Sequence, residues 1–467
     1  MSLSRRDFAR VSGLTAAGLL LPAGVAAAEP VLGRDPWREV PAILARICAA
    51  SSEFGRFRRK DYDVTAYGAK GDGLTKNTEA FYRAITACNR AGGGRVVVPA
   101  GTFLTGGIRL LSNVELHLAE GATIKFSTDP NDYLPLVLTR WEGTLCYNYQ
   151  PFIYAFEQKN VAITGKGTID GDAVSGQWAS WGAGSTPLLR QWGEDGVPVE
   201  ERIMGVGKNM RPNMIQFFRC RNVLVEDVLI KNPAMWSLHL VFSQNITVRR
   251  VEIYSTNSQG DGVDIDSSSY VHVHDSKFNT NDDCVVIKSG RDADGRRVGI
   301  PSSHVVVERT KFSGRWGGIT IGSETSGGVS KVFCRDCEIN APDFPGRYPV
   351  KHALYVKTNQ DRGGVIDGVH LRNVFGQNVE REVLFVSMYY QNGGTKGFFP
   401  RIDNVTVDRM KINGGKLAAC FRGFPQQHIK NVQITNSAFT GITEPNLIEN
   451  TDDLVFRNTT INGVVPA

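Results

Sequence analysis

A short unit of alternating apolar and polar residues recurs along most of the chain and limits the folds that it can adopt. The clearest copies begin at Asn113, Asn160, Asn222 and Asn245, and related copies begin at Tyr270, at His304 and near residues 402 and 429. Asn222 and Asn245 are 23 residues apart, and Tyr270 follows 25 residues later. A period of this length with alternating residues is typical of a repeat protein.

Each copy consists of a short strand pattern, a polar bend and a second short strand pattern. The segments between bends are too short to be the helices of a helical repeat of similar period. The period is also too short for a propeller blade of four antiparallel strands. A coil with three short strands is a rung of a right-handed parallel β-helix, in which stacked rungs bury a continuous core. The repeat therefore predicts an all-β solenoid, with the recurring asparagines forming a hydrogen-bonded ladder between rungs.

The ends of a solenoid need covering, because the terminal rungs would expose the core. Residues 77–91 read NTEAFYRAITACNRA, an amphipathic pattern with Asn77 in place to cap it, and this predicts an N-terminal capping helix. Residues 173–212 are rich in Gly and Trp and interrupt the period, so we expect a long loop beside the groove. The catalytic domain is predicted to span residues 61–467, after a mixed, basic leader over residues 29–60.

Residues 1–28 have the three parts of a secretion signal. Arg5 and Arg6 form a twin arginine, an apolar run covers residues 14–21, and small residues lead to Ala28. The apolar run is too short to span a bilayer, and no other segment is apolar enough. We therefore expect a bacterial signal of the twin-arginine type and a periplasmic or secreted protein that folds before export.

Charge and cysteine content exclude some other classes. Lys and Arg number 53 against 47 Asp and Glu, and no dense basic tract is present, so nucleic-acid binding has no support. The eight cysteines are scattered, which predicts buried thiols and leaves room for one or two disulfides. Cys334 and Cys337 have the spacing of half a zinc site, but no second half follows, so no metal site is expected.

Three aspartates are candidates for a catalytic site. Asp282 and Asp283 stand side by side before an apolar, β-branched run, and Asp261 lies about one coil earlier. Residues one coil apart stack roughly 5 Å from each other, so the three carboxylates could converge. Their repulsion would raise at least one pKa and keep that group protonated, as an acid–base glycosidase requires.

Two other interpretations of this cluster remain open on spacing alone. Asp and Asn are common in the turns at rung corners, and that structural role is slightly favoured. Clustered aspartates also bind calcium.

Several blocks resemble one enzyme family. They are DVTAYGAKGDGLTKNTEAF, NPAMWSLHLV, DGVDID, DDCVVIKSGRDADGRRVGIPS, GGITIGSETSGGV and VKTNQDRGG. From about residue 61 to its C-terminus the chain resembles the polygalacturonases, glycoside hydrolase family 28, in particular bacterial members. The resemblance implies a right-handed parallel β-helix that hydrolyses pectin backbones with inversion. It also implies a pectic polysaccharide or oligosaccharide as the partner, no cofactor, and a monomer.

The resemblance assigns roles to the aspartates. Asp282 would be the general acid, while Asp261 and Asp283 would hold and deprotonate the attacking water. Inversion requires room for that water, so the acid and the base should stand further apart than in a retaining enzyme.

Three signatures of the family are altered here, and of the first, Asn-Thr-Asp before a Gly, only Asp261 is retained. The Gly-His-Gly signature is matched by RWGG, so Trp316 replaces a histidine; it cannot exchange a proton, and it would either face a sugar ring or cap a rung. The Arg-Ile-Lys signature is matched by YVK, so Lys357 is kept as a charged anchor and Tyr355 replaces the arginine fork. The missing cation favours rhamnogalacturonan over homogalacturonan without deciding between them.

Four other residues are candidates for substrate binding. Lys288 and Arg291 follow the aspartate pair and could bind a carboxylate, although an exposed rung edge is nearly as good an interpretation. His239 lies one coil before Asp261, where a histidine satisfied within its strand is the commoner case. Arg211 is a candidate by position.

Two rival functions belong to other classes. A calcium-dependent pectate-type lyase on the same kind of β-helix would need the metal and a cationic base. A non-catalytic glycan-binding β-helix would need no acid or base, and the retention of all three aspartates favours the hydrolase.

Overall fold

The computed structural model describes residues 35–51, 60–174, 176–182 and 184–466. The chain divides into two compact units, residues 1–38 and residues 39–467, and only residues 35–38 of the first are described. The predicted secretion signal lies outside the described residues. A 3-10 helix, η1 (Pro36–Glu39), begins the described part, and none of the described helices is long and apolar enough to cross a membrane.

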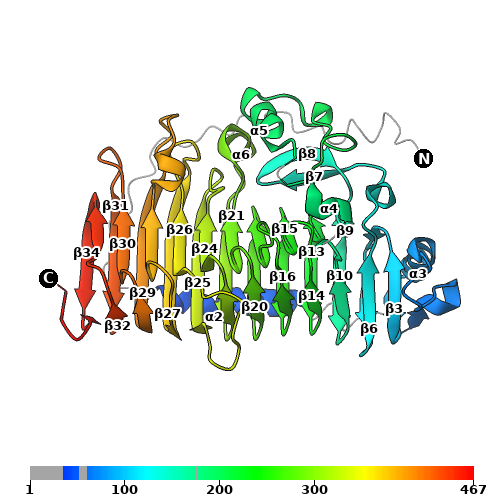
Figure 1. The fold of residues 1–467 in the computed structure, drawn as a ribbon, viewed down its shortest axis with the longest axis horizontal. Helices are drawn as coiled ribbons and strands as arrows, with labels where there is room; N and C mark the ends of the chain where they lie inside the picture. The colour runs from blue at the N-terminus through cyan, green and yellow to red at the C-terminus, as the bar shows by residue number, and fades with distance from the viewer. Residues whose placement is uncertain (1–34, 52–59, 175, 183, 467) are drawn as a thin grey trace. The chain divides into compact units, whose positions relative to one another are not determined.

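Parallel strands stacked in successive coils make up most of the second unit (Figure 1). One sheet, called sheet B, has eleven strands, one from each coil. They are β4 (Ile108–Arg109), β9 (Ile153–Phe156), β12 (Ile215–Phe218), β15 (Leu238–Val241), β18 (Val263–Asp266), β21 (Val285–Lys288), β24 (Gly317–Gly322), β26 (His352–Lys357), β28 (Leu384–Ser387), β30 (Ala419–Arg422) and β33 (Leu447–Glu449).

The other large sheet, called sheet A, has 22 strands in two parallel series. The first series is β1 (Asp61–Asp63), β2 (Gly94–Val98), β5 (Val114–Leu118), β10 (Lys159–Gly165), β13 (Arg221–Glu226), β16 (Gln244–Arg249), β19 (Ser269–His274), β22 (Ser302–Glu308), β25 (Val329–Ile339), β27 (Val365–Gln377), β29 (Arg401–Gly415), β31 (Ile429–Thr435) and β34 (Thr451–Arg457). The second series is β3 (Gly101–Thr105), β6 (Ala122–Phe126), β11 (Thr168–Asp170), β14 (Leu229–Lys231), β17 (Glu252–Tyr254), β20 (Lys277–Thr280), β23 (Lys311–Gly314), β32 (Ala438–Ile442) and β35 (Thr460–Ile461), while β25, β27 and β29 run through both. A coil therefore contributes up to three strands, and the predicted right-handed parallel β-helix is confirmed.

The repeated asparagines form the predicted ladder. The Asn160 amide donates to Asn113 at 2.9 Å, Asn222 donates to Asn160 at 2.8 Å, and Asn245 donates to Asn222 at 3.3 Å. All four have a φ between 55° and 62°, the left-handed conformation that asparagine tolerates better than most residues. The ladder explains why this residue recurs at one bend of the rung.

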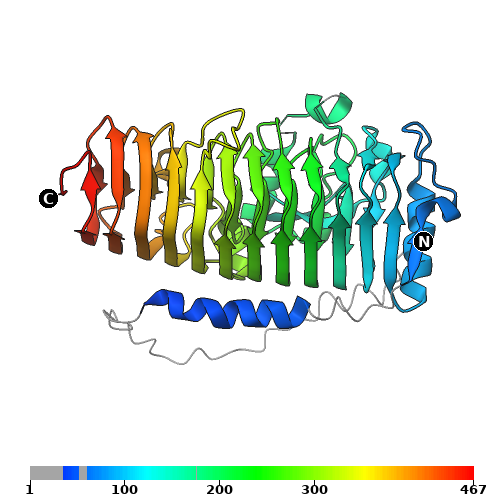
Figure 2. The same cartoon turned by 90° about the horizontal axis from the view of Figure 1, so that it is seen from below.

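The leader contains a helix that the sequence did not predict. α2 (Val40–Ser51) packs on sheet A against β13, β16 and β19, and Figure 2 shows it crossing these strands from one coil to the next. The Arg46 guanidinium lies 3.5 Å from the centre of the Tyr270 ring, which stacks on His304 with ring centres 4.4 Å apart. Tyr270 and His304 begin two copies of the repeat, so they continue the ladder position with rings in place of amides.

α3 (Thr78–Arg90) is the predicted capping helix. Its buried face is formed by Ala80, Phe81, Ala84, Ile85 and Cys88. The expected capping contact of Asn77 is wrong, because its side chain bonds to the main chain of Lys70, Thr75 and Leu104 instead of to the helix. Asn77 thus fixes the loop that precedes the helix.

The interruption of the period is more ordered than a loop. Residues 173–212 contain α4 (Gly176–Ser180), α5 (Thr186–Asp195) and the 3-10 helix η5 (Val199–Glu201), which corrects the prediction of a long loop. An antiparallel hairpin of β7 (Val137–Trp141) and β8 (Thr144–Asn148) stands beside them, as does α6 (Asp292–Val298) (Figure 1). The remaining 3-10 helices are η3 (Val64–Tyr67), η4 (Pro130–Tyr133) and η6 (Tyr390–Gly393).

All eight cysteines lie in the described part of the chain, and all are free thiols. Seven are buried and Cys48 is exposed. The expectation of buried thiols is confirmed, and the one or two disulfides that the sequence allowed are not formed.

Candidate active site

The register of sheet B brings the three aspartates together. β18 pairs with β21 so that Val263 lies opposite Val285, and Asp261 and Asp283 each precede these residues by two positions. One carboxylate oxygen from each of Asp261, Asp282 and Asp283 lies within 4.8 Å of the others. The convergence expected from stacking is therefore present.

Asp283 is held by three donors. Its Oδ1 accepts hydrogen bonds from the Gly317 N–H and the Thr320 hydroxyl, both at 2.9 Å, and its Oδ2 lies 2.8 Å from Lys357 Nζ. Only 1% of Asp283 is exposed. These bonds fix the orientation of the carboxylate.

Gly317 is needed where this carboxylate meets β24. A Cβ at that position would lie 2.0 Å from Thr320 Oγ1 and 3.1 Å from Asp283 Oδ1. Since atoms of Thr320 and Asp283 fill that space, only glycine lets its N–H reach the carboxylate.

Asp261 has a weaker set of partners. Its Oδ2 lies 3.4 Å from Lys288 Nζ, and 3% of the residue is exposed. Burial raises the pKa of Asp261 to about 6; Lys288 opposes this shift and the charge of Asp283 adds to it. Near neutral pH Asp261 is therefore a base able to accept a proton.

Asp282 is the third member. Burial raises the pKa of Asp282 well above its usual range, and the negative charges of Asp261 and Asp283 raise it further. The repulsion inferred from the sequence is present, but burial is the larger cause. A carboxyl group in this state keeps its proton at neutral pH and can donate it.

Lys288 lies beneath the aspartates and is buried. Its Nζ is 3.4 Å from Asp261, 3.3 Å from Asp264 and 3.4 Å from Glu324, and it lies 3.8 Å from the centre of the Trp236 ring. Burial lowers the pKa of Lys288, but the carboxylates outweigh this and raise it well above its usual range. An exposed rung edge is therefore excluded for this residue.

A cavity of about 200 Å³ opens onto the aspartates. Besides Trp236 and the charged residues already described, its lining is Glu142, Arg190, Gln259, Ser323, Tyr390 and Gln391, with Arg291. Glu142 stands at the tip of the β7–β8 hairpin and accepts from Arg190 at 2.5 Å, Gln259 at 2.7 Å and Arg291 at 3.4 Å. The hairpin, α5 and η6 thus wall the cavity above sheet B.

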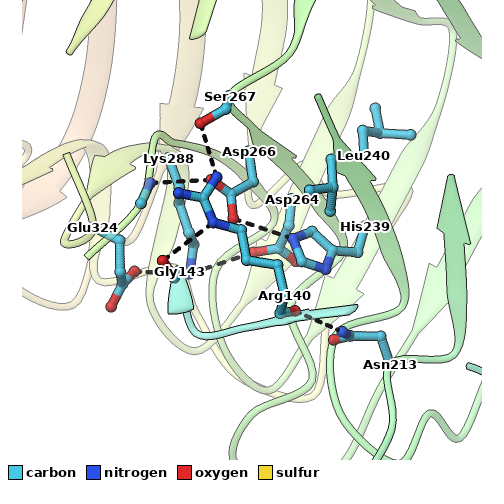
Figure 3. A network of polar contacts seen from close by, with 12 residues as sticks. Arg140, Gly143, Asn213, His239, Leu240, Asp264, Asp266, Ser267, Lys288 and Glu324 are labelled. Carbon is cyan, nitrogen blue, oxygen red and sulfur yellow. Dashed lines mark hydrogen bonds and ion pairs between the residues drawn. The ribbon is translucent and has the colours of Figure 1, made fainter. Parts of the chain in front are cut away.

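The predicted binding residues fall into two groups. Lys288, Arg291 and Lys357 line the cavity. His239 does not, because it is fully buried, with Nδ1 at 3.0 Å from Gln216 Nε2 and Nε2 at 3.4 Å from Asp266 Oδ2 (Figure 3). The alternative of a histidine satisfied within its strand describes it better.

Trp316, Tyr355 and Arg211 are also absent from the lining. The Trp316 and Tyr355 rings lie parallel with centres 6.2 Å apart, and Lys351 Nζ covers one Trp316 face at 3.7 Å. Arg211 donates to the Gln259 side chain, which itself reaches the cavity. Any contact of these three residues with a substrate remains a prediction.

Sequence reasoning missed several lining residues. Glu142, Arg190, Tyr390 and Gln391 belong to segments that interrupt the repeat, where stacking gives no neighbour relation. The sequence contained one signal for these residues: it predicted that residues 173–212 lie beside the groove, and Arg190 belongs to that segment.

The spacing of the carboxylates differs from the one expected for inversion. Their nearest oxygens lie within 4.8 Å of one another, whereas inverting enzymes typically separate acid and base by roughly 6.5–9.5 Å. Inversion therefore stays a prediction of the resemblance.

The same trio is the one cluster of acidic, histidine or cysteine side chains in the described residues with the spacing of a metal site. Lys357 and Lys288 already supply positive charge at 2.8 Å and 3.4 Å from two of the carboxylates. This pairing suits proton transfer better than cation binding.

Comparison with known proteins places this geometry in context. The model of glycosyl hydrolases family 28 matches residues 88–436. A hyperthermoactive exopolygalacturonase from Thermotoga maritima is 39% identical, with a TM-score of 0.84 over 91% of this chain and 97% of that one. An exo-poly-alpha-D-galacturonosidase from Dickeya chrysanthemi is 27% identical over 87% of this chain and 71% of its own length. A probable polygalacturonase from Vitis vinifera is 27% identical over 81% of this chain and 74% of its own length.

Proposed function

The chain belongs to glycosyl hydrolases family 28, and from this premise we propose that it is an exo-acting hydrolase that removes galacturonate from the end of a polygalacturonate chain. The observation that carries the proposal is the walled cavity around the aspartates. Its volume of about 200 Å³ is below the roughly 300–1,000 Å³ of sites for drug-sized ligands, and it suits one sugar rather than several. The names of the Thermotoga maritima and Dickeya chrysanthemi relatives also support exo action.

The proposed reaction assigns one step to each carboxyl group. Asp282 donates its proton to the glycosidic oxygen as the bond from that oxygen to the anomeric carbon breaks. Water attacks the anomeric carbon and gives its proton to Asp261, so one C–O bond forms and one breaks. Asp283, fixed by Lys357, accepts a hydrogen bond from the same water and orients it.

Cations in the cavity support a uronate as the sugar that is bound. Arg190 and Arg291 line it together with Lys357. The two arginines lie outside the altered Arg-Ile-Lys signature, which contains Lys357. The missing arginine at position 355 therefore does not leave the cavity without guanidinium groups. The preference for rhamnogalacturonan stays a prediction, which the next experiment tests.

Product analysis on two substrates tests the proposal. We expect polygalacturonate to release monogalacturonate from the first time points, with a slow fall in viscosity, and debranched rhamnogalacturonan to release far less. Chromatography of early products and viscometry are the measurements. Early release of mixed oligomers would exclude exo action, and products from rhamnogalacturonan alone would exclude the proposed substrate. Proton NMR of the first anomer would test inversion.

The pH dependence follows from the two shifted groups. Asp261 must be ionised to accept a proton, so activity is present above its pKa of about 6 and is lost as the pH falls through it. Asp282 must be protonated, so activity is lost above its own raised pKa. We expect a bell-shaped profile of kcat/KM whose acidic limb lies near pH 6. Initial rates on a short oligogalacturonide measure it, and a rate that keeps rising well below that limb would exclude Asp261 as the base.

A further inference from the structure

The charged groups that line the cavity, together with Asp264 beneath it, contain more acids than bases. Ion pairs link most of them, including Lys357 with Asp283 and Arg190 with Glu142. The carboxyl groups are Glu142, Asp261, Asp264, Asp282, Asp283 and Glu324, and the cations are Arg190, Lys288, Arg291 and Lys357. An uncompensated buried charge is strongly unfavourable, so two of these carboxyl groups should be neutral. Asp282 is one of them, since it is the proposed proton donor.

Asp264 is the second candidate by its position. It lies on β18, it is fully buried, and neither of its carboxyl oxygens has a hydrogen-bond partner among the described residues. Among the described residues Lys288 is the one cation paired with it, at 3.3 Å from Oδ1, and that lysine also pairs with Asp261 and Glu324. Figure 3 shows Lys288 shared between Asp264 and Glu324.

The other carboxyl groups have better compensation. Glu324 accepts from Arg291 at 3.0 Å and from the Ser323 hydroxyl at 3.0 Å. Asp266, on the same strand, is paired with Arg140 at 2.9 Å. These donors stabilise the ionised form, and Asp264 has no equivalent.

We propose that Asp264 holds a proton at neutral pH and donates it in a hydrogen bond to Asp261, acting as a positioning residue for the base. The Asp264 and Asp261 side chains contact each other. Two carboxylates can only accept, so this contact becomes a hydrogen bond when one of the two carries a proton. The inference rests on the proposed function, because it concerns the group that takes the proton from water. It explains why one lysine suffices beneath three carboxyl groups.

The electrostatics of the neighbours agree with this assignment. Burial raises the pKa of Asp264 well above its usual range, the charge of Asp261 raises it further, and Lys288 opposes the shift. The charged and titratable groups facing this region are Asp261 and Asp266 from its own coil, Lys288 from β21, His239 from β15 and Arg140 from β7. Burial lowers the pKa of His239, so it adds no positive charge at neutral pH.

Infrared spectroscopy tests the proton directly and needs no activity. A protonated carboxyl group has a carbonyl stretch that a carboxylate lacks. We expect Asp282→Asn to retain such a band at neutral pH, and the double variant with Asp264→Asn to lose it. Asp403→Asn is the matched control, because Asp403 also has a raised pKa but is only partly buried and lies away from the cavity, on β29 of sheet A. Absence of the band in a folded Asp282→Asn protein would overturn the proposal, even if Asp264 variants failed to fold.

The pH profile supplies a second readout. The asparagine of Asp264→Asn can still donate to Asp261, so we expect the acidic limb of its kcat/KM profile to move little. Asp264→Ala removes the donor, and its acidic limb should rise by about one pH unit, a roughly tenfold loss of kcat/KM below that limb. If Asp264 were ionised, Asp264→Asn would remove a negative charge and lower the limb, which would contradict the proposal. If the wild-type protein hydrolysed no pectic substrate, the proposed function would fail while the infrared result still decided the state of Asp264.

Discussion

We expect Asp282→Asn to lower kcat by about a thousandfold while KM changes little, because general acid catalysis contributes roughly 10²–10⁴-fold. Asparagine has nearly the same size, but its amide cannot give a proton to the glycosidic oxygen. Burial and two neighbouring carboxylates keep the Asp282 carboxyl group protonated in the native protein. Its loss therefore affects the transition state more than the binding of the substrate.

The leaving group makes this test specific. A galacturonide with a nitrophenol leaving group needs little protonation, so the loss caused by Asp282→Asn should be much smaller on that substrate than on oligogalacturonide. Steady-state kinetics on both substrates measure the difference. Asp403→Asn, on sheet A, is the matched control and should retain the wild-type kcat. An equal loss on both substrates would contradict the role of Asp282 as the acid.

We expect Arg140→Met to lower the free energy of unfolding by about 3–5 kcal/mol, because it leaves the buried Asp266 carboxylate unpaired. Arg140 Nη1 lies 2.9 Å from Asp266 Oδ1 and 2.8 Å from Ser267 Oγ, and both charged side chains are fully buried (Figure 3). The Arg140 Nε donates to the Gly143 carbonyl at 3.1 Å. The pair thus joins the β7–β8 hairpin to sheet B.

Urea unfolding, followed by circular dichroism, measures this effect. Arg219→Met is the matched control: Arg219 pairs with Glu157 at 3.2 Å, but their side chains are 40% and 53% exposed. An exposed pair of this kind contributes less than about 1 kcal/mol. Adding Asp266→Leu to Arg140→Met should recover part of the stability, since it removes the unpaired charge. Equal losses at the buried and exposed pairs would contradict the expectation.

Much of the fold was readable because a solenoid relates distant residues by a nearly constant period. The asparagines at 113, 160, 222 and 245 share a left-handed bend, and their amides bond from rung to rung. The same period predicted that Asp261 would meet Asp283, and the register of β18 and β21 places them so. Family resemblance then supplied the roles, which the spacing alone did not.

The period gave no information where the chain departs from it. Glu142 reaches the cavity from a hairpin, and Tyr390 reaches it from η6, so neither has a neighbour at a fixed distance in sequence. For the same reason residues 173–212 were expected to be a loop, although α4 and α5 lie within them. His239 and Tyr355 show the converse limit: both were candidates for substrate binding and both lie on strands of sheet B, yet packing places them outside the cavity.

The sequence by itself determined the coil, the ladder and the meeting of three aspartates, because each depends on local strand pattern and a repeated length. Only the tertiary structure decided the depth of burial, the walls of the cavity and the partners of each charge. Those properties arise from side chains brought together from the hairpin, α5, η6 and five successive coils of the β-helix. Burial is also the largest cause of the pKa shifts of Asp261, Asp264 and Asp282, so the protonation states of the site follow from packing rather than from the order of residues.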